Sequence, residues 1–227
     1  MRRLACLDGL RGVLAVYVLV SHMAPFSAFP WWMVRLFLHG EAAVDVFFIL
    51  SGMVIAGSFE SFGWQAKPFL MARAARLLPV FFIAFPLAVA VQPVPMGLER
   101  MPWIGAENTA ARTIWSDDWP ATWVPEIAAH LAMIHGIFPN FVLPNAWVSF
   151  LGAAWSLSTE WQFYFLMAAL SAAFVGLRER LELSRTAIML LSLAVAALVW
   201  TRGMPPEWQF SKAFLPNEAQ YFALGLA

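Results

Sequence analysis

The stretch LDGLRGVLAVYVLVSHM, Leu7 to Met23, places Arg11 and His22 at the two ends of ten residues that are almost all apolar. A run of this kind predicts a helix in lipid, because a helix satisfies its backbone hydrogen bonds within the segment. An ionisable side chain inside such a helix is energetically costly, and it is therefore a candidate for function. The stretch predicts a first membrane span, from about Gly12 to Phe29, whose ionisable residues are candidates for function.

The composition of the whole chain is that of a membrane protein. Of its 227 residues, 61% are hydrophobic and 12% are charged, and the mean hydropathy is +0.69. Soluble domains contain about twice that share of charged residues. We therefore expect an all-α, polytopic transmembrane helical bundle of about six spans that forms a single domain over residues 1–227. The chain has a single cysteine, Cys6, which excludes an internal disulfide and a multi-cysteine metal site. We expect neither a bound metal nor a nucleic-acid partner.

Apolar runs predict where the other spans lie. They cover, approximately, Ala42 to Phe59, Leu77 to Val91, Leu157 to Leu177, Thr186 to Trp200, and a last segment that starts near Ala219. The last segment is about nine residues long, whereas a crossing helix needs about 20, so we expect a sequence truncated at its C-terminus. Residues 92–126 are rich in Trp, Asp, Asn and Thr, and they predict an external loop with a short interfacial helix.

The segment from Ile127 to Leu143 is apolar on average, but polar and helix-breaking residues interrupt it: His130, His135, Gly136, Pro139 and Asn140. A lipid-exposed span with these groups would be costly, so we expect the segment to be re-entrant or covered by protein. If it does not cross, nine of the fourteen basic residues lie inside; if it crosses, the basic cluster from Arg178 to Arg185 moves outside. The positive-inside rule favours the first arrangement, with a cytoplasmic N-terminus.

Several ionisable residues lie within the predicted spans. His22 follows Arg11 by about 16 Å along a helix, which puts Arg11 at the cytoplasmic face and His22 near mid-depth. Glu41 and Asp45 lie one turn apart at the start of the second span, and Glu160 opens a later span on the same outer side. A histidine beside carboxylates in a dry site is a competent proton carrier near neutral pH. A structural interpretation stays open, in which the histidine only bonds neighbouring backbone and the acids complement helix dipoles.

Arg73 and Arg76, in the string RAARLLP, are three residues apart and share a helix face at a membrane boundary. Two guanidinium groups at that spacing can clamp a polyphosphate with paired hydrogen bonds. Basic residues at the cytoplasmic ends of spans also fix topology and meet lipid phosphates, and this second interpretation stays open. The same two interpretations apply to Arg11, which lies near Asp8.

Four blocks of this sequence resemble the membrane acyltransferase 3 family: LDGLRGVLAVYVLVSH, GEAAVDVFFILSGMVI, RAARLLPVFF and AWSLSTEWQFYF. Members of that family O-acylate sugars, lipopolysaccharide, peptidoglycan and small molecules, and they usually have about ten spans. The resemblance implies that Arg11 and His22 are the family's arginine and histidine separated by ten residues. It likewise implies that Arg73 and Arg76 are its paired arginines and Glu160 its acidic residue. Thr159 stands where Val is more familiar, a change that we do not expect to matter.

The resemblance implies an integral membrane acyltransferase that moves an acyl group, in particular acetyl, from acyl-CoA to a hydroxyl of a carbohydrate or another acceptor. We expect such an enzyme to have no bound cofactor and to lie in the inner (plasma) membrane. His22 would act as general base or as transient acyl carrier, oriented by Asp45 or Glu160. Arg73, Arg76 and Arg11 would hold the phosphates of acyl-CoA. A proton-coupled transporter uses similar intramembrane groups and is the alternative, and a structural membrane subunit is the third class.

Overall fold

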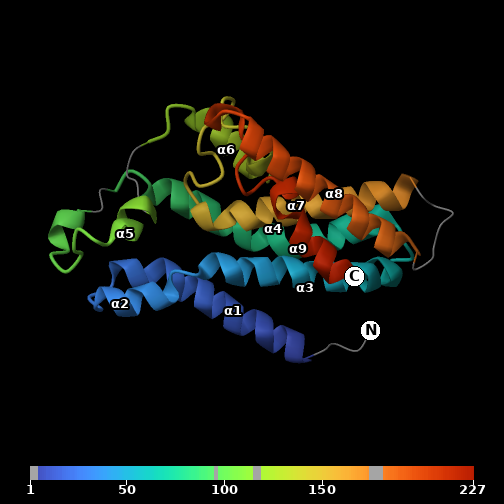
Figure 1. Cartoon of the computed structure of the whole chain (residues 1–227), viewed down its shortest axis with the longest axis horizontal. Helices are drawn as coiled ribbons and strands as arrows, with labels where there is room; N and C mark the ends of the chain where they lie inside the picture. Colours follow the sequence, from blue (N-terminus) through green and yellow to red (C-terminus); the bar gives the residue numbers. More distant parts are fainter. Residues whose placement is uncertain (1–4, 95–96, 115–118, 174–180) are drawn as a thin grey trace. The chain divides into compact units, whose positions relative to one another are not determined.

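The computed structural model describes residues 5–94, 97–114, 119–173 and 181–227. In these ranges the chain is helical and contains no strand, apart from an isolated bridge between Pro139 and Phe210. The predicted all-α class is therefore confirmed. Figure 1 shows the order of the helices along the chain. The chain divides into two compact units. The N-terminal unit comprises Arg2–Phe47 and Val89–Trp119, and the core unit comprises Phe48–Ala88 and Pro120–Ala227.

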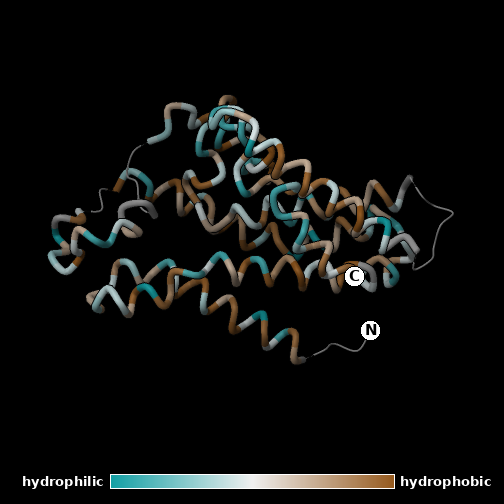
Figure 2. Tube along the Cα trace, viewed as in Figure 1, coloured by the Kyte–Doolittle hydropathy of each residue, from teal (hydrophilic) through white to brown (hydrophobic). Residues whose placement is uncertain are grey.

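Within the described ranges, four segments are long and apolar enough to cross a membrane. They are Cys6–Phe26, Trp31–Ile55, Ala66–Val91 and Ser184–Gly203. Apolar residues predominate along each of them (Figure 2). This supports the predicted polytopic helical class, whereas the predicted count of about six spans is not confirmed. The predicted span Leu157 to Leu177 falls on a helix that is not among the four, and its last four residues lie outside the described ranges.

The N-terminal unit begins with α1, Ala5–Met23. This helix starts before the predicted Gly12 and places Asp8 in its first turn, where a negative charge complements the positive end of the helix dipole. It ends before the predicted Phe29, because a short 3₁₀ turn, η1, occupies Ala24–Phe26 and contains Pro25. Two short helical pieces follow, α2 at Trp31–Val34 and η2 at Arg35–Phe37.

The predicted external loop folds back onto the turn that follows α1. It contains a 3₁₀ turn, η3, at Leu98–Arg100 and a short helix, α5, at Thr109–Ile114, as predicted for a loop with its own helix. The Asn108 side chain donates a hydrogen bond to the Pro25 carbonyl at 2.6 Å. The Trp103 indole donates to the Phe26 carbonyl at 3.1 Å. These two bonds fix the loop close to the end of the helix that carries His22.

The helix α3, Gly40–Ser61, contributes its first part to the N-terminal unit and its remainder to the core unit. Its start packs tightly on α1, since a Cβ atom at Gly40 would collide with the Ser21 side chain. A similar close approach occurs in the core unit, between α3 and α9, Leu215–Leu226. There a Cβ at Gly52 would collide with the Phe222 carbonyl, and one at Gly225 with the Ile49 carbonyl. Only glycine allows these helix backbones to approach so closely.

Besides part of α3, the described residues of the core unit form the long helices α4 at Ala66–Val91, α7 at Trp155–Ala173 and α8 at Leu181–Gly203, together with α9. The helix α4 starts eleven residues before the predicted Leu77, so that Arg73 and Arg76 both lie within this one helix. The Phe222 ring stacks on Phe48 at 4.7 Å and on Phe163 at 4.1 Å, which joins α9 to α3 and α7. The helix α8 packs against α9 and leaves large apolar side chains exposed, as lipid contact requires.

The ambiguous segment from Ile127 to Leu143 contains no helix long enough to cross a membrane. It holds the end of α6, Trp123–Leu131, a 3₁₀ turn, η4, at His135–Ile137, and turns. Both histidines of the segment are buried by protein, with exposed fractions of 0% for His130 and 1% for His135. The protein thus covers both histidines, whereas the expectation that the segment is re-entrant or protein-covered along its whole length stays a prediction. Two of the basic residues behind the topology prediction, Arg178 and Arg180, lie outside the described ranges.

Candidate active site

His22 lies in the last turn of α1, and its side chain is exposed. Its Nδ1 lies 2.8 Å from the Val18 carbonyl oxygen, one turn earlier. A carbonyl only accepts hydrogen bonds, so Nδ1 carries the proton, and in the neutral ring Nε2 carries the lone pair. Nε2 makes no hydrogen bond with any residue in the described ranges. The predicted backbone bond is therefore present, and it leaves one ring nitrogen available as a base.

Arg11 and His22 share a face of α1. Eleven residues at 100° per residue return to within about 20° of the starting direction, at a distance of about 16 Å along the axis. The continuous helix Ala5–Met23 preserves that spacing, because it has no break between the two residues. The helix therefore presents a guanidinium and an imidazole on one line, as the separation of ten residues between them suggested.

Glu160 lies in the first turns of α7 and is half-buried. Its Oε1 accepts two hydrogen bonds, one from the Ser51 hydroxyl at 2.8 Å and one from the Tyr164 hydroxyl. Ser51 comes from α3 and Tyr164 from the next turn of α7. The two donors together fix the orientation of the carboxylate, because with only one of them the carboxylate could still rotate about that single hydrogen bond.

Arg73 is buried in the core unit, with an exposed fraction of 9%. One guanidinium nitrogen donates to the Ser58 hydroxyl at 2.6 Å. Its Cζ lies 5.3 Å from the centroid of the Phe69 ring and 5.1 Å from that of Tyr164, so the cation is held against two aromatic faces. The side chain is thus fixed on several sides.

Arg76 lies one turn after Arg73 on α4 but is exposed. The two arginines share a helix face as predicted, yet their surroundings differ. Arg73 is packed among aromatic rings, whereas Arg76 has its guanidinium open to an approaching anion. A shared role in clamping a polyphosphate stays a prediction for both.

The remaining predicted carboxylates lie near the start of α3. Asp45 is half-buried and Glu41 is exposed, one turn earlier. Both belong to the N-terminal unit together with Arg11 and His22, whereas Arg73, Arg76 and Glu160 belong to the core unit. The predicted meeting of His22 with Glu160 stays a prediction. Within the core unit, the structure brings Arg73 and Glu160 to the same tyrosine.

Three hydroxyl residues of this site were missed in the sequence: Ser51, Ser58 and Tyr164. Little in the sequence indicated that these residues belong to a site, because serine and tyrosine also occur in membrane helices as ordinary packing residues. Ser51 and Glu160 are 109 residues apart in the chain, and no short pattern connects them. Their role depends on the packing of α3 against α7.

The segment AWSLSTEWQFYF also anchors α7 to its surroundings. The Ser158 hydroxyl donates to the Met133 carbonyl at 3.0 Å. The Thr159 hydroxyl and the Gln162 amide both donate to the Ala213 carbonyl, at 3.0 and 2.8 Å. The Gln162 side chain also accepts a bond from the Leu215 backbone at the start of α9. Glu160 is therefore carried by a helix that is bonded on two sides.

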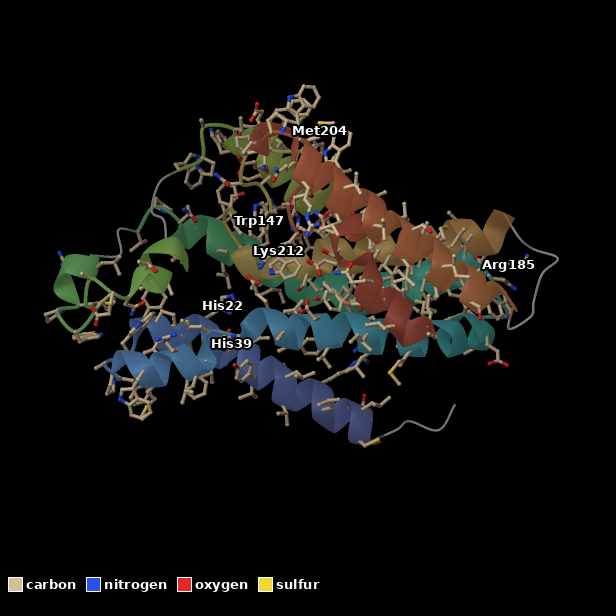
Figure 3. All side chains as sticks on the ribbon, in the orientation of Figure 1. His22, His39, Trp147, Arg185, Met204 and Lys212 are labelled. Carbon is tan, nitrogen blue, oxygen red and sulfur yellow. The ribbon has the colours of Figure 1, made fainter. Side chains whose placement is uncertain are left out.

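Close to this anchor, Lys212 lies over two indole rings. Its Nζ is 4.7 Å from the Trp155 centroid and 5.3 Å from that of Trp147, and Figure 3 shows Lys212 beside Trp147. In the sequence, Lys212 entered only the count of basic residues, and neither it nor the two rings was predicted to belong to a site. Bonds to the Ala213 carbonyl hold the backbone next to Lys212, so its ammonium is presented from a fixed segment.

A second group of ionisable residues, Glu126, His130 and His135, is buried in the core unit. The two imidazole rings stack with centroids 4.0 Å apart and planes 6° apart, and Phe85 stacks on His130. Burial lowers the pKa of His130 and lowers the pKa of His135 to about 3, the neighbouring His130 adding to the second effect. Stacked rings cannot direct their lone pairs at one ion, and the described ranges hold no group of three metal-ligating side chains.

The fold and its candidate spans define a helical membrane protein with an exposed histidine and a fixed carboxylate. The family model described as an acyltransferase domain, that of the acyltransferase 3 family, matches residues 4–227. Protein 2 in the picA locus of Rhizobium radiobacter is 36% identical over 92 residues, which cover 39% of this chain and 45% of that protein. The chain thus spans less than half the length of this relative. No solved structure matches it.

The family match extends over nearly the whole chain, across both units. The chain therefore belongs to the acyltransferase 3 family, and the resemblance noted in its sequence is confirmed. Together with the four candidate spans, this supports a membrane acyltransferase.

Proposed function

We propose that this protein transfers an acyl group, in particular acetyl, from acyl-CoA to a hydroxyl of a carbohydrate or another cell-surface or small-molecule acceptor. The observation that carries the proposal is the state of His22. Its Nδ1–H is bonded to the Val18 carbonyl, and its Nε2 makes no hydrogen bond with the described residues. An imidazole with one nitrogen held by a hydrogen bond and the other available can serve as the general base that the reaction requires.

In the proposed reaction, Nε2 of His22 takes the proton of the acceptor hydroxyl. The acceptor oxygen then bonds to the thioester carbonyl carbon and gives a tetrahedral intermediate. When that intermediate collapses, the carbon–sulfur bond breaks, the acyl ester remains on the acceptor, and the coenzyme A thiolate recovers the proton from the imidazolium. A variant of this scheme, in which Nε2 first accepts the acyl group itself, uses the same nitrogen.

The donor would bind through its phosphates. Arg76 is exposed on α4 and Arg73 lies one turn before it, while Arg11 lies on the His22 face of α1. Guanidinium groups pair with phosphate through two parallel hydrogen bonds, which suits a polyphosphate carrier better than ammonium groups do. Asp45 or Glu160 would stabilise the imidazolium that forms as His22 accepts the proton.

The acceptor would enter through the Trp-rich loop. The bonds from Asn108 to Pro25 and from Trp103 to Phe26 attach this loop within four residues of His22 in the sequence. Aromatic side chains offer flat apolar faces to sugar rings, and Trp103 is bonded to the turn that directly follows the helix of the proposed base. This arrangement supports a carbohydrate as the acceptor.

The direct test uses the purified full-length protein in liposomes with [¹⁴C]acetyl-CoA and candidate acceptors. We expect label to pass to a hydroxyl compound and coenzyme A to be released in equal amount. The acceptor would be identified by mass spectrometry of surface glycans and small-molecule extracts from cells with and without the gene. Substrate counterflow in the same liposomes, without any acylated product, would instead establish the transporter.

We further propose that the protein lies in the inner (plasma) membrane with its N-terminus in the cytoplasm, as the basic-residue count suggests. Ala106 and Ser184 are both exposed and lie in the loop and at the start of α8. A cysteine at Ala106 should react with an impermeant thiol reagent in intact cells, whereas cysteines at Ser184 and the native position 6 should react only after the membrane is opened. Labelling of Ser184→Cys from outside would overturn this topology.

A further inference from the structure

Tyr164 contacts two of the residues that the proposed function uses. Its hydroxyl donates to Oε1 of Glu160, one turn earlier on α7. Its ring lies under the guanidinium of Arg73, which comes from α4, with Cζ 5.1 Å from the ring centroid. The side chain is 4% exposed, so both contacts are made away from bulk solvent. One buried side chain therefore joins a carboxylate and a cation of the site.

The hydroxyl contact determines which carboxylate oxygen of Glu160 is used. Ser51 and Tyr164 both donate to Oε1, from different helices. Oε2 makes no hydrogen bond with the residues of the described ranges. A carboxylate held through one oxygen presents the other in a fixed direction, and such preorganisation is what a group facing a reacting centre requires.

The ring contact determines where the charge of Arg73 lies. The Ser58 hydroxyl holds one guanidinium nitrogen at 2.6 Å, while the rings of Phe69 and Tyr164 lie against the cation. The Phe69 and Tyr164 rings contact each other edge to face at 5.7 Å, so the aromatic walls support one another. The guanidinium has five N–H donors, and the bond to Ser58 uses one of its two NH₂ groups.

We propose, on the basis of the proposed function, that Tyr164 is a positioning residue for acyl transfer. It orients Glu160 through its hydroxyl and Arg73 through its ring, and it holds the two at a fixed separation. Tyr164 does not touch the reacting atoms. It acts on the reaction only through the two residues that it contacts.

The two contacts can be separated by mutation. Tyr164→Phe keeps the ring under Arg73 and removes only the bond to Glu160. We expect kcat to fall about tenfold or more, because a hydrogen bond to a charged group is lost, while KM for acyl-CoA stays within about twofold. Tyr164→Leu removes both contacts and should also raise KM for acyl-CoA. A tyrosine that served only to fill space would give no such division between kcat and KM.

A double-mutant cycle tests whether Tyr164 acts through Glu160. Ser51 holds the same oxygen, so either hydroxyl alone should preserve part of the orientation. We expect Ser51→Ala with Tyr164→Phe to lower kcat by more than the product of the two single effects. Ser171→Ala is the matched control, because Ser171 lies on α7 and bonds only the Ala168 carbonyl of its own helix. Its kcat should equal that of the wild type.

Melting temperatures and size-exclusion profiles of all variants in detergent establish that they fold. Wild-type kcat in folded Tyr164→Phe would overturn the proposal, and so would single effects that multiply without coupling. Failure of the wild type itself to transfer an acyl group would refute the proposed function and this proposal together. Transfer by the wild type with normal turnover in Tyr164→Phe would refute this proposal alone.

Discussion

His22 and the pair His130 and His135 show how differently one residue type is used in the two units. His22 is exposed, has Nδ1 bonded to Val18 and has no hydrogen bond at Nε2 with the described residues. His130 and His135 are almost fully buried, stack on each other, and leave three ring nitrogens without hydrogen bonds to the described residues. The first arrangement prepares a base, because one nitrogen is fixed and the other reachable. The second keeps both rings neutral and packs them as aromatic surfaces.

Replacement of His22 by Ala gives the largest expected effect. Transfer should fall by about 100-fold or more, because the general base is removed. Membrane insertion and the melting temperature should change little, since the exposed side chain bonds only its own helix. The measurement is label transfer per inserted molecule. His39→Ala is the control, because His39 is also an exposed histidine of the N-terminal unit (Figure 3). Near-normal turnover of an inserted His22→Ala protein would show that His22 is not the general base.

His135→Ala should have the opposite profile. Removal of a buried ring from the stack with His130 leaves a cavity, and we expect a loss of about 2 kcal/mol in the free energy of unfolding. Turnover per folded molecule should stay within about twofold. Thermal unfolding in detergent and the transfer assay measure the two quantities on one preparation. A stable protein with strongly reduced turnover would show that this pair takes part in the chemistry.

The pH dependence of stability sharpens the comparison further. Burial lowers the folded pKa of His135 to about 3, whereas the unfolded residue titrates near 6.5. The unfolded state therefore binds more protons than the folded state between these two pH values. The contribution of His135 to the free energy of unfolding is thus fully present above about pH 6.5, and it decreases as the pH falls towards 3. From pH 7.5 to 5.5 we expect a loss of about 1 kcal/mol. His130, which faces Glu126, adds a loss in the same direction.

His135→Phe provides the control for that measurement. Phenylalanine keeps an aromatic ring in the stack but takes up no proton, so melting curves recorded at pH 7.5 and 5.5 should lie closer together than those of the wild type. An unchanged difference between the two pH values would assign the acid sensitivity to other groups.

The smallest effect is expected at Thr159, a buried polar residue whose bonds are satisfied. Its hydroxyl donates to the Ala213 carbonyl, which also accepts from Gln162. Thr159→Val therefore leaves that carbonyl bonded, and stability should fall by no more than about 1 kcal/mol. Gln162→Leu removes the second donor together with the acceptor for Leu215, and it should cost more. Equal losses in the two variants, measured by thermal unfolding, would contradict the shared-acceptor argument.

The sequence by itself determined the helical class, the approximate positions of α1, α3, α4 and α8, and the choice of His22. Each of these predictions depends on local chemistry. An apolar run of sufficient length forms a helix in lipid, and an ionisable residue within that run is a candidate for function because it is costly to bury there. The family resemblance had the same origin, because its four blocks are short and contiguous. Helix ends were less accurate, since Pro25 ended α1 early and α4 continued through its charged first turns.

Tertiary structure alone decided the contacts between distant segments. The bonds of Ser51 and Tyr164 to Glu160, the place of Arg73 between two rings, and the burial of His130 against His135 all depend on which helix faces meet. Serine, tyrosine and arginine have the same local propensities whether or not a partner lies opposite. A sequence pattern reports only the period of one helix, whereas the partner of a side chain is fixed when the helices pack.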